Sequence, residues 1–191
     1  PQSSSKNKEV NVEGIDIVLA MDISSSMLAA DLKPDRLEAS KAVASDFVKG
    51  RPNDRMGLMV FSGETFTQVP LTTDHGMMLN MLQEMKCGML EDGTAIGDGL
   101  ASAISRLKDS EAISKVVILL TDGDNNAGSI DPSTAAEMAK LFGIRVYTIG
   151  AGTRGTAPSP TQTPFGGIQY QQVPVTINDE LLQQIATETG G

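Results

Sequence analysis

The sequence contains only one cysteine and one histidine among its 191 residues. Because Cys87 stands alone, a disulfide within the chain is excluded, and the redox compartment is left open. His75 is the only residue that could act as the base of a Ser-His-Asp triad, so a serine hydrolase is disfavoured.

The chain also lacks long apolar runs and an excess of positive charge. No stretch approaches the ~20 apolar residues of a membrane-spanning helix. Fifteen Lys and Arg stand against 24 Asp and Glu, which gives a formal net charge of −9. Nucleic acids and anionic lipid surfaces are bound by clustered basic side chains. We therefore expect no nucleic-acid partner and no direct membrane binding by this segment.

Length and composition indicate one globular domain. Hydrophobic residues make up 40% of the chain and charged residues 20%, which is ordinary for a folded protein. Residues 1–13 are polar and predict an arm or linker, so the domain is expected to span residues 14–191. The chain begins at Pro1 and ends at Gly191, and we expect it to be excised from a longer protein.

Apolar runs and helical patterns alternate along the chain. The run Ile15–Met21 is typical of a strand buried on both faces of a parallel sheet. Residues 65–69 follow a tight turn and predict an antiparallel edge strand. The alternation predicts a doubly wound, mostly parallel α/β sheet flanked by helices, which is Rossmann-like and binds ligands at the carboxyl ends of its strands. The predicted strands are 15–21, 56–61, 65–69, 115–120 and 144–149, and the predicted helices are 35–49, 74–86, 96–108, 132–143 and one capped by Asn178.

Residues 152–174 interrupt this alternation. They hold Pro158, Pro160, Pro164 and Pro174 among many Ser, Thr and Gln residues, which excludes a continuous helix. We expect a surface insertion or a hairpin here.

Three short oxygen-rich clusters lie where predicted strands end or helices begin. Asp22-Ile23-Ser24-Ser25-Ser26 follows the first apolar run, Thr121-Asp122-Gly123 follows another, and Gly93-Thr94-Ala95 precedes a helix. In an extended loop, residues two apart point the same way, so the first cluster should present three oxygens together. The candidate metal ligands are Asp22, Ser24, Ser26, Thr94 and Asp122.

This ligand set contains only oxygen donors, which suit hard cations. We expect Mg²⁺, with Mn²⁺ or Ca²⁺ as alternatives, rather than zinc or copper. Two carboxylates balance a divalent charge, and at most five protein ligands leave one octahedral position for an outside oxygen. Serine and aspartate also cap helices and form turns, and the first cluster alone favours that simpler interpretation. The three clusters together favour a metal site.

The three clusters, in this order, resemble the von Willebrand factor A fold and its metal-ion-dependent adhesion site. Asp22, Ser24 and Ser26 match the first motif, Thr94 the second and Asp122 the third. Ser25 departs from the family pattern, which usually has glycine there, but it removes no ligand. The resemblance implies that an Asp or Glu of a partner protein completes the metal coordination. It also implies one more strand beyond the final Thr-Gly-Gly turn, so the sheet of this chain is expected to end near residues 144–149.

Other stretches are similar to bacterial Bat aerotolerance-type proteins, the BatA-like members above all. They are Pro70–His75, Gly93–Asp98 and Leu119–Gly128. This resemblance implies an anchor in the bacterial inner membrane outside the segment, with the domain on either its periplasmic or its cytoplasmic face. It also implies other Bat-type proteins and a MoxR-type AAA+ ATPase as partners.

Two literal motif matches fail on their context. Residues 150–155 read G-x-G-x-x-G, but Pro158 and Pro160 follow where a dinucleotide-binding fingerprint requires a helix. Residues 122–126 begin like an EF-hand loop, but the sixth position is Ala127 and the twelfth is Ser133 instead of Gly and Glu.

We expect a protein-interaction domain without catalytic activity. No serine lies in a G-x-S-x-G elbow, and no Lys or Arg near the clusters offers a clamp for phosphate. The alternative is a metal-assisted hydrolase of the phosphoesterase type, because Mg²⁺ held by carboxylates can activate water. A third interpretation is a structural scaffold that binds no metal.

Overall fold

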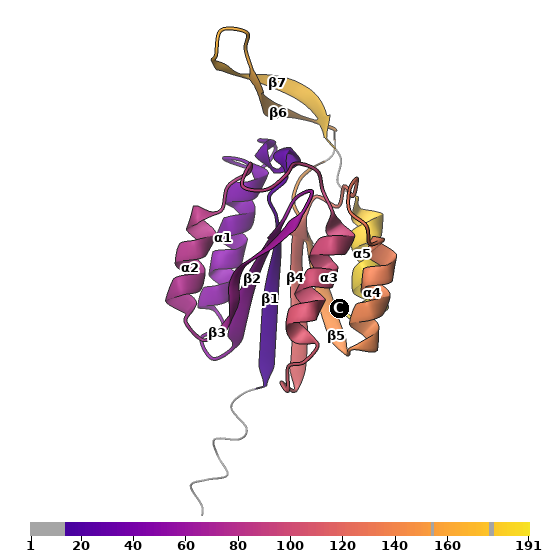
Figure 1. Ribbon diagram of the computed structural model, residues 1–191. Helices are drawn as coiled ribbons and strands as arrows, with labels where there is room; N and C mark the ends of the chain where they lie inside the picture. The colour runs from indigo at the N-terminus through magenta and orange to yellow at the C-terminus, as the bar shows by residue number, and fades with distance from the viewer. Residues whose placement is uncertain (1–13, 154, 176–177) are drawn as a thin grey trace, which may run out of the picture.

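The computed structural model describes residues 14–153, 155–175 and 178–191 (Figure 1). The arm predicted at residues 1–13 lies outside the described residues. The elements in chain order are β1 (Ile15–Asp22), η2 (Ser25–Leu28), α1 (Arg36–Lys49), β2 (Arg55–Phe61), β3 (Thr65–Thr72), α2 (His75–Glu84), α3 (Ile96–Leu107), β4 (Ser114–Thr121), α4 (Pro132–Leu141), β5 (Ile144–Gly150), β6 (Gly155–Gln162), β7 (Ile168–Val175) and α5 (Asp179–Thr189).

The main sheet has five strands in the order β3-β2-β1-β4-β5. β1 pairs in parallel with β2 and β4, and β4 pairs in parallel with β5. β3 is antiparallel to β2 and closes one edge, as the sequence predicts. Within the described part of the chain, β5 forms the other edge, which confirms the expected end of the sheet near residues 144–149. The strand order reverses direction at β1, so the carboxyl ends of β1 and β4 lie at the switch point.

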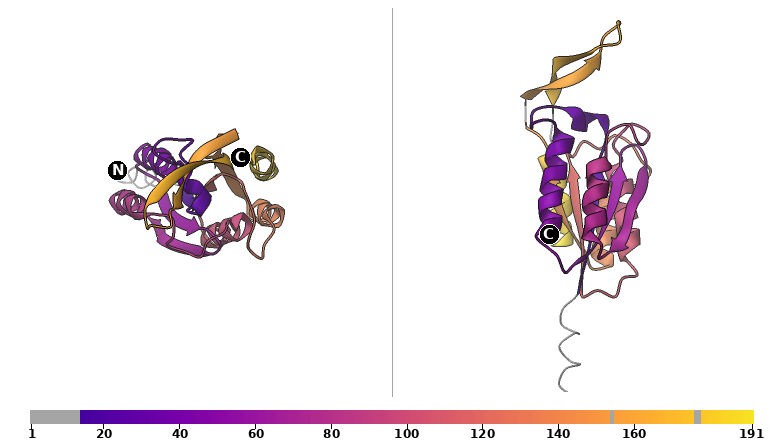
Figure 2. Two further views of the ribbon diagram at one scale, coloured as in Figure 1. Left: turned by 90° about the horizontal axis from the view of Figure 1, so that it is seen from above. Right: turned by 90° about the vertical axis from the view of Figure 1, so that its left-hand side faces the viewer.

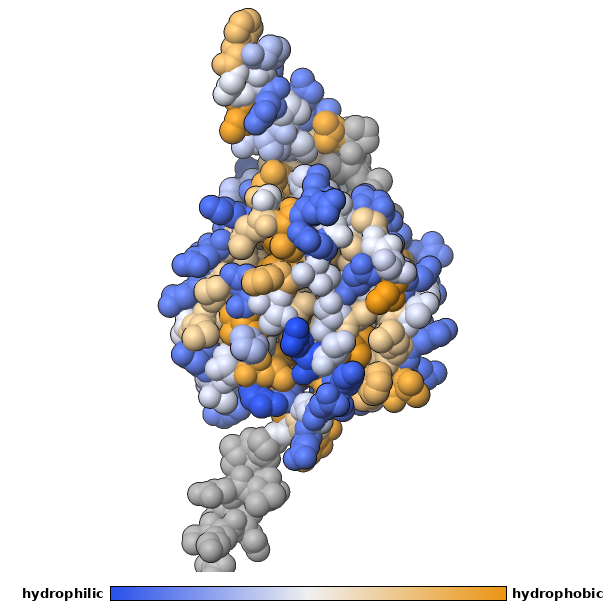
Figure 3. Space-filling view, viewed as in Figure 1, coloured by the Kyte–Doolittle hydropathy of each residue, from blue (hydrophilic) through white to orange (hydrophobic). Residues whose placement is uncertain are grey.

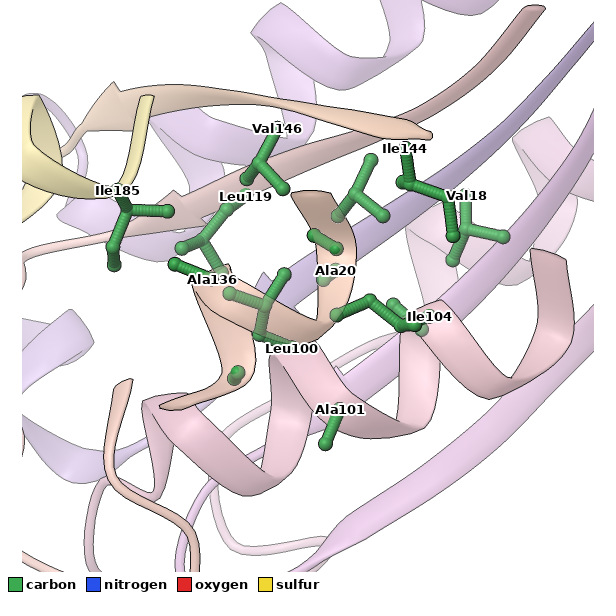
Figure 4. Packing of buried hydrophobic residues seen from close by; sticks show 14 of the residues in the cluster. Val18, Ala20, Leu100, Ala101, Ile104, Leu119, Ala136, Ile144, Val146 and Ile185 are labelled. Carbon is green, nitrogen blue, oxygen red and sulfur yellow. The ribbon is translucent and has the colours of Figure 1, made fainter. Parts of the chain in front are cut away.

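Both faces of the sheet are buried, because alternate residues of the central strands enter two separate cores. Val18 and Ala20 of β1 pack with α3, α4 and α5 on one face (Figure 4). Ile17 and Leu19 of the same strand pack with α1 and α2 on the opposite face. This double burial explains why β1 reads as a continuous apolar run rather than as alternating residues.

Residues 152–174 contain the predicted hairpin. β6 and β7 pair antiparallel and form a second, two-stranded sheet of their own. The hairpin extends beyond the carboxyl end of the main sheet, above η2 and the loops that follow the central strands (Figures 1 and 2). The backbone N–H of Ala30 donates to the carbonyl of Pro158 at 2.8 Å, and Ala157 is fully buried. The base of the hairpin is therefore attached to the domain.

The start of α3 is locked to the loop that follows β4. Asp98 accepts hydrogen bonds from the backbone N–H groups of Ser129 and Ile130, at 3.0 and 2.8 Å. The close approach requires a glycine, because a Cβ at Gly97 would lie 1.8 Å from the carbonyl oxygen of Ile130. This contact fixes the loop before α3, which carries Thr94, against the loop after β4, which carries Asp122.

Replacing Gly97 with alanine is expected to destabilise the domain by about 3 kcal/mol, because the added carbon meets rigid backbone. Gly76→Ala in α2 is the matched control, since the nearest atom to its added Cβ is a side-chain oxygen of Asp74 at 3.4 Å. The control should be neutral or up to ~1 kcal/mol more stable than the wild type, because alanine favours helix. Urea unfolding measures both changes, and equal midpoints for the two variants would contradict this packing.

Candidate metal centre

Two carboxylates meet at the ends of the central strands. β1 ends at Asp22, and Asp122 follows the last residue of β4. Met21 is paired with Leu120, so Asp22 lies level with Thr121, and Asp122 follows one residue later on the neighbouring strand. Asp22 is 0% exposed and Asp122 is 1% exposed, which places two acidic groups inside the protein. Burial of this kind requires hydrogen bonds or a positive charge nearby.

The side chains of Asp22, Ser24, Ser26 and Asp122 form one unbroken chain of oxygen atoms. Ser24 Oγ donates to Asp22 Oδ1 at 2.5 Å and lies 3.1 Å from Ser26 Oγ. Ser26 Oγ donates to Asp122 Oδ2 at 2.5 Å. Thr121 Oγ1 donates to Asp22 Oδ2 at 2.7 Å, from the opposite side. Each of these four candidate ligands therefore contacts at least one of the others.

The first cluster reaches this arrangement by a different backbone path than the sequence predicts. Asp22 ends β1 and Ser24 is extended, with φ −68° and ψ 163°, but a short 3-10 helix begins at Ser25. The expectation of an extended loop is therefore wrong beyond Ser24. A backbone N–H to carboxylate bond, from Ser24 to Asp22 at 2.8 Å, turns the chain at this point. Helical geometry after the turn directs Ser26 toward Asp122 instead.

Thr94 is buried in the adjoining loop, at 3% exposure. Its backbone N–H donates to the side chain of Asn126 at 2.9 Å, and its carbonyl accepts from the N–H groups of Asn126 and Ala127. These bonds place the Thr94 loop beside the loop that follows Asp122. Among the described residues, no hydrogen bond joins Thr94 Oγ1 to the other four candidates, so its role as a ligand stays a prediction.

The electrostatics of the carboxylate pair favour a bound cation. Burial, and next the negative charge of Asp122, raise the pKa of Asp22 to about 7. Hydrogen bonds from Ser24 and Thr121 act in the opposite direction but do not compensate. Near neutral pH the pair therefore carries negative charge that its hydroxyl partners do not balance.

Arg36 is a buried cation beside the cluster, and it does not appear among the sequence candidates. It is 1% exposed, and its guanidinium donates to both oxygens of Asp31 at 2.8 Å. A third nitrogen donates to Asp122 Oδ2 at 3.2 Å. The hydrogen bonds from Arg36 hold the pKa of Asp31 well below its usual range. A single guanidinium therefore joins a candidate ligand to a second, non-ligand carboxylate.

Two further contacts around the site were missed by the sequence patterns. The backbone N–H and the hydroxyl of Ser25 donate to Asp92, at 3.2 and 3.0 Å, and tie the first cluster to the loop before Thr94. Asn125 accepts from the backbone N–H of Ile96 at 2.9 Å. Ser25 thus uses the side chain that distinguishes it from glycine to join two of the three loops.

One signal in the sequence could have identified Arg36. It is the first residue of α1, directly after the capping residue Asp35. A positive charge is unfavourable at a helix N-terminus, because the helix dipole is positive there. A buried arginine in this position indicates a compensating acidic partner, which the structure supplies as Asp31 and Asp122.

The donor set fits a hard divalent cation. Asp22 and Asp122 supply the charge, and the neutral hydroxyls of Ser24 and Ser26 supply further oxygens without cancelling the electrophilic character of an ion. The described residues hold no group of three or more His, Cys, Asp or Glu side chains arranged for a metal. The site is thus distinct from carboxylate-rich calcium loops and from zinc sites.

The structure gives neither the G-x-G-x-x-G sequence nor the EF-hand-like sequence the backbone that its usual ligand requires. β5 ends at Gly150 and β6 begins at Gly155, so no helix opens at the G-x-G-x-x-G sequence. Asn125 and Asn126 direct their side-chain oxygens to the backbone of residues 96 and 94, rather than into a calcium loop.

Among the described residues, the structure contains no helix that is long and apolar enough to cross a membrane.

Comparison with known proteins finds a matching family and related sequences. The sequence model of the von Willebrand factor type A domain matches residues 16–190. An uncharacterized protein of Borreliella burgdorferi is 32% identical over 191 residues, which cover 99% of this chain and 56% of that protein. The chain thus spans about half the length of this curated relative.

Two solved structures share the fold. An aerotolerance-related membrane protein from Bacteroides fragilis has a TM-score of 0.80 and 32% identity, over 93% of this chain and 89% of that one. The protein BatB from Bacteroides thetaiotaomicron has a TM-score of 0.77 and 32% identity, over 93% and 88% of the two chains.

Proposed function

Because this chain belongs to the von Willebrand factor type A domain family, we propose that it is a metal-dependent protein-interaction domain without catalytic activity. A divalent cation, Mg²⁺ in the first place, is held by Asp22, Ser24, Ser26 and Asp122, with Thr94 as the fifth ligand. When bound, the ion supplies an electrophilic centre that accepts the carboxylate of an Asp or Glu from a partner protein. Mn²⁺ and Ca²⁺ are the alternative ions.

The observation that carries this proposal is the unbroken oxygen chain between two buried carboxylates. Ser24 Oγ and Ser26 Oγ bridge Asp22 to Asp122 through contacts of 2.5, 3.1 and 2.5 Å. The raised pKa of Asp22 reflects burial and repulsion from Asp122. Hydrogen bonds from neutral hydroxyl groups do not remove this repulsion. A cation on these oxygens relieves it.

The surrounding residues hold the ligands in place. Arg36 fixes one oxygen of Asp122, and Thr121 fixes one oxygen of Asp22. Ser25 and Asp92 join the loops on the open side of the cluster. The ligand oxygens are therefore oriented before any partner arrives, which lowers the entropic penalty of binding.

The relatives support a proposal for the cellular setting of this domain. The structural neighbour from Bacteroides fragilis is described as an aerotolerance-related membrane protein, and the curated relative from Borreliella burgdorferi is nearly twice as long as the matched segment. We infer that this domain belongs to a membrane-associated Bat-type protein, with its anchor in the bacterial inner membrane outside residues 14–191. Other Bat-type proteins and a MoxR-type AAA+ ATPase are the proposed partners.

The alternative of a metal-assisted hydrolase receives less support. The guanidinium nitrogens of Arg36 already donate to Asp31 and Asp122, so this side chain offers no clamp for a phosphate. His75 contacts the carbonyl of Asp54, which precedes β2, at 2.6 Å. It therefore lies at the amino end of the sheet, opposite the cluster. Magnesium-dependent turnover of p-nitrophenyl phosphate that is lost in Asp22→Asn would favour the hydrolase.

The double variant Ser24→Ala with Ser26→Ala tests the proposal directly. We expect it to remain folded, with about 1–3 kcal/mol lost because Asp22 and Asp122 each lose a buried hydroxyl partner. Its Mg²⁺ affinity, measured by calorimetry, should fall by at least ~100-fold, since two of the ligands are gone. Capture of partner proteins from solubilised bacterial membranes should disappear, as it should for the wild type in EDTA.

Ser25→Ala is the matched control, because its hydroxyl lies in the same loop but contacts Asp92 rather than the oxygen chain. Its Mg²⁺ affinity should stay within about threefold of the wild type, a difference below ~1 kcal/mol. Equal Mg²⁺ binding by the double variant and the control would show that the cation binds elsewhere.

A further inference from the structure

The outer part of the β6–β7 hairpin, residues 164–172, is exposed and uncharged. Residues 155–175 contain no Asp, Glu, Lys or Arg, although the chain has 39 charged residues. Phe165 at the turn is 98% exposed, and Ile168 and Tyr170 of β7 are 72% and 62% exposed. Figure 3 shows hydrophobic residues at the end of the hairpin, far from the two cores of the domain. Exposed aromatic and aliphatic side chains of this kind are typical of binding surfaces.

Prolines close the outer edge of β6. Pro158 is paired with Gln172 and Pro160 with Tyr170. Proline has no N–H, so it fits an antiparallel pair only where the backbone nitrogen faces away from the neighbouring strand. The carbonyl of Pro158 confirms this direction, because it accepts from Ala30 outside the hairpin at 2.8 Å. The outer edge of β6 is thus blocked by proline and partly occupied by the domain.

The same pairing leaves the outer edge of β7 open from Ile168 to Gln172, before Pro174. In an antiparallel pair, two residues opposite each other direct their backbone N–H and C=O groups either both toward the partner strand or both away from it. Tyr170 and Gln172 therefore direct their N–H and C=O groups away from β6, and so does Ile168, which is paired with Gln162. None of these three positions is a proline. A row of unpaired donors and acceptors on an edge strand is a template for another strand.

The hairpin is connected to the candidate metal centre through a chain of hydrogen bonds and ion pairs. Asp31 accepts from the backbone N–H of Thr153 at 2.6 Å and from its hydroxyl at 2.9 Å, just before β6. The same carboxylate binds Arg36, which contacts Asp122. Thr153, just before the hairpin, is therefore three contacts away from the candidate ligand Asp122. It rises from the same end of the sheet (Figure 1).

We propose that the free edge of β7 binds an extended segment of the partner protein by strand addition, next to the carboxylate that the metal centre accepts. The proposal rests on the proposed function of that centre. Main-chain hydrogen bonds to residues 168, 170 and 172 give affinity, and the side chains of Ile168 and Tyr170 select apolar residues at alternate positions. Because the hairpin carries no charge, the added segment is uncharged, with its single acidic residue reserved for the metal.

Gln172→Pro tests whether the outer edge of β7 binds a strand, because it removes one backbone N–H from that edge. It removes one outward N–H and leaves the inward hydrogen bonds of the hairpin intact, as Pro158 and Pro160 do on the other strand. Gln172→Ala is the matched control, since it removes the side chain but keeps the N–H. The probe is a phage-displayed library of ten-residue linear peptides with one fixed Asp, selected on the 191-residue chain in Mg²⁺.

We expect the selected peptides to bind Gln172→Pro at least ~10-fold more weakly than the wild type, and Gln172→Ala within about twofold. EDTA should also weaken the wild-type complex. Calorimetric Mg²⁺ affinity should be unchanged in both variants, which shows that neither has lost its fold. On peptide binding, hydrogen exchange at the amides of Ile168, Tyr170 and Gln172 should slow.

Three results would overturn the strand-addition proposal. Equal peptide affinity of Gln172→Pro and Gln172→Ala, with EDTA still effective, would leave the metal-dependent function standing without the hairpin edge. If the selection enriched no peptide, an extended segment would not be the ligand of the β7 edge. Sedimentation that shows a dimer of this chain, dissociated by Gln172→Pro, would assign the edge to a second copy. Loss of peptide binding in Gln172→Pro with no effect of EDTA would instead overturn the metal-dependent function.

Discussion

Arg36→Met is expected to destabilise the metal-free domain by about 3–5 kcal/mol, the largest effect of any single change considered for this chain. The Arg36, Asp31 and Asp122 side chains are 2%, 4% and 1% exposed, so the substitution leaves two carboxylates without their shared cation in a nearly dry environment. Methionine has a similar length and fills the same space, so loss of charge rather than a cavity dominates. Urea unfolding in EDTA at pH 7.5 measures the change.

Arg55→Met is the matched control for this loss. Arg55 donates to both oxygens of Asp16 at the opposite end of the sheet, so the pair has the same chemistry. Its side chain, however, is 46% exposed, and Asp16 keeps a hydrogen bond from Ser110. Water can therefore replace the guanidinium, and we expect about 1 kcal/mol, as for exposed pairs. Equal losses for the two variants would show that burial does not set the contribution of Arg36.

The same substitution should strengthen the binding of a cation. The guanidinium lies 3.2 Å from Asp122 Oδ2, so its charge competes with a metal for that oxygen. Removing it should raise Mg²⁺ affinity by roughly tenfold, which corresponds to ~1.4 kcal/mol. Saturating Mg²⁺ should then restore more stability to Arg36→Met than to the wild type. A fall in Mg²⁺ affinity would mean that Arg36 chiefly positions Asp122.

The convergence of Asp22 and Asp122 could be predicted from sequence because it depends on local information. Each carboxylate directly follows an apolar run, and parallel strands bring their carboxyl ends to one edge of the sheet. The doubly wound order, the antiparallel edge strand and the hairpin within residues 152–174 follow from the same local patterns. Register with β4 then sets the final spacing, with Met21 opposite Leu120.

The remaining contacts of the site depend on tertiary geometry that no spacing encodes. Arg36 and Asp122 are 86 positions apart, and Ser25 and Asp92 are 67 apart. Arg36 is marked in the sequence only by its position at the start of a helix, and that signal does not identify Asp31 and Asp122 as its partners. The 3-10 turn after Ser24 forms because Asp22 captures the backbone N–H of Ser24, a local choice that competes with an extended loop.

The metal-free domain should lose stability as the pH rises from about 4 to about 7. Asp22 has its pKa raised to about 7 from an ordinary value of 3.8, so the folded state binds this proton more tightly than the unfolded chain. Within this window the folded state holds more protons, and the free energy of unfolding therefore falls with increasing pH. The full contribution of this one group is at most ~4 kcal/mol.

Other acidic groups act in a different pH range. Hydrogen bonds from Arg36 lower the pKa of Asp31, and a backbone hydrogen bond from Gly93 is the main cause that lowers the pKa of Asp92. Their stabilising contributions are present above the unfolded pKa and are lost as the pH falls below about 4. The interval between pH 4.5 and 7.5 thus isolates Asp22, and urea unfolding in EDTA across this interval measures its effect.

Magnesium should reverse the trend, because a cation on Asp22 displaces the proton. Mg²⁺ affinity is expected to rise with pH up to about 7. The rise should be close to tenfold per pH unit where Asp22 is protonated in the metal-free domain. Asp22→Asn is the matched variant, since the amide has the same shape without the charge. It should abolish Mg²⁺ binding, flatten the pH dependence in EDTA, and equal or exceed the wild type in stability at pH 7.5. If the wild type and Asp22→Asn instead follow parallel stability curves between pH 4.5 and 7.5, the buried carboxylate does not hold the proton that the metal must displace, and the electrostatic basis of the proposed site fails.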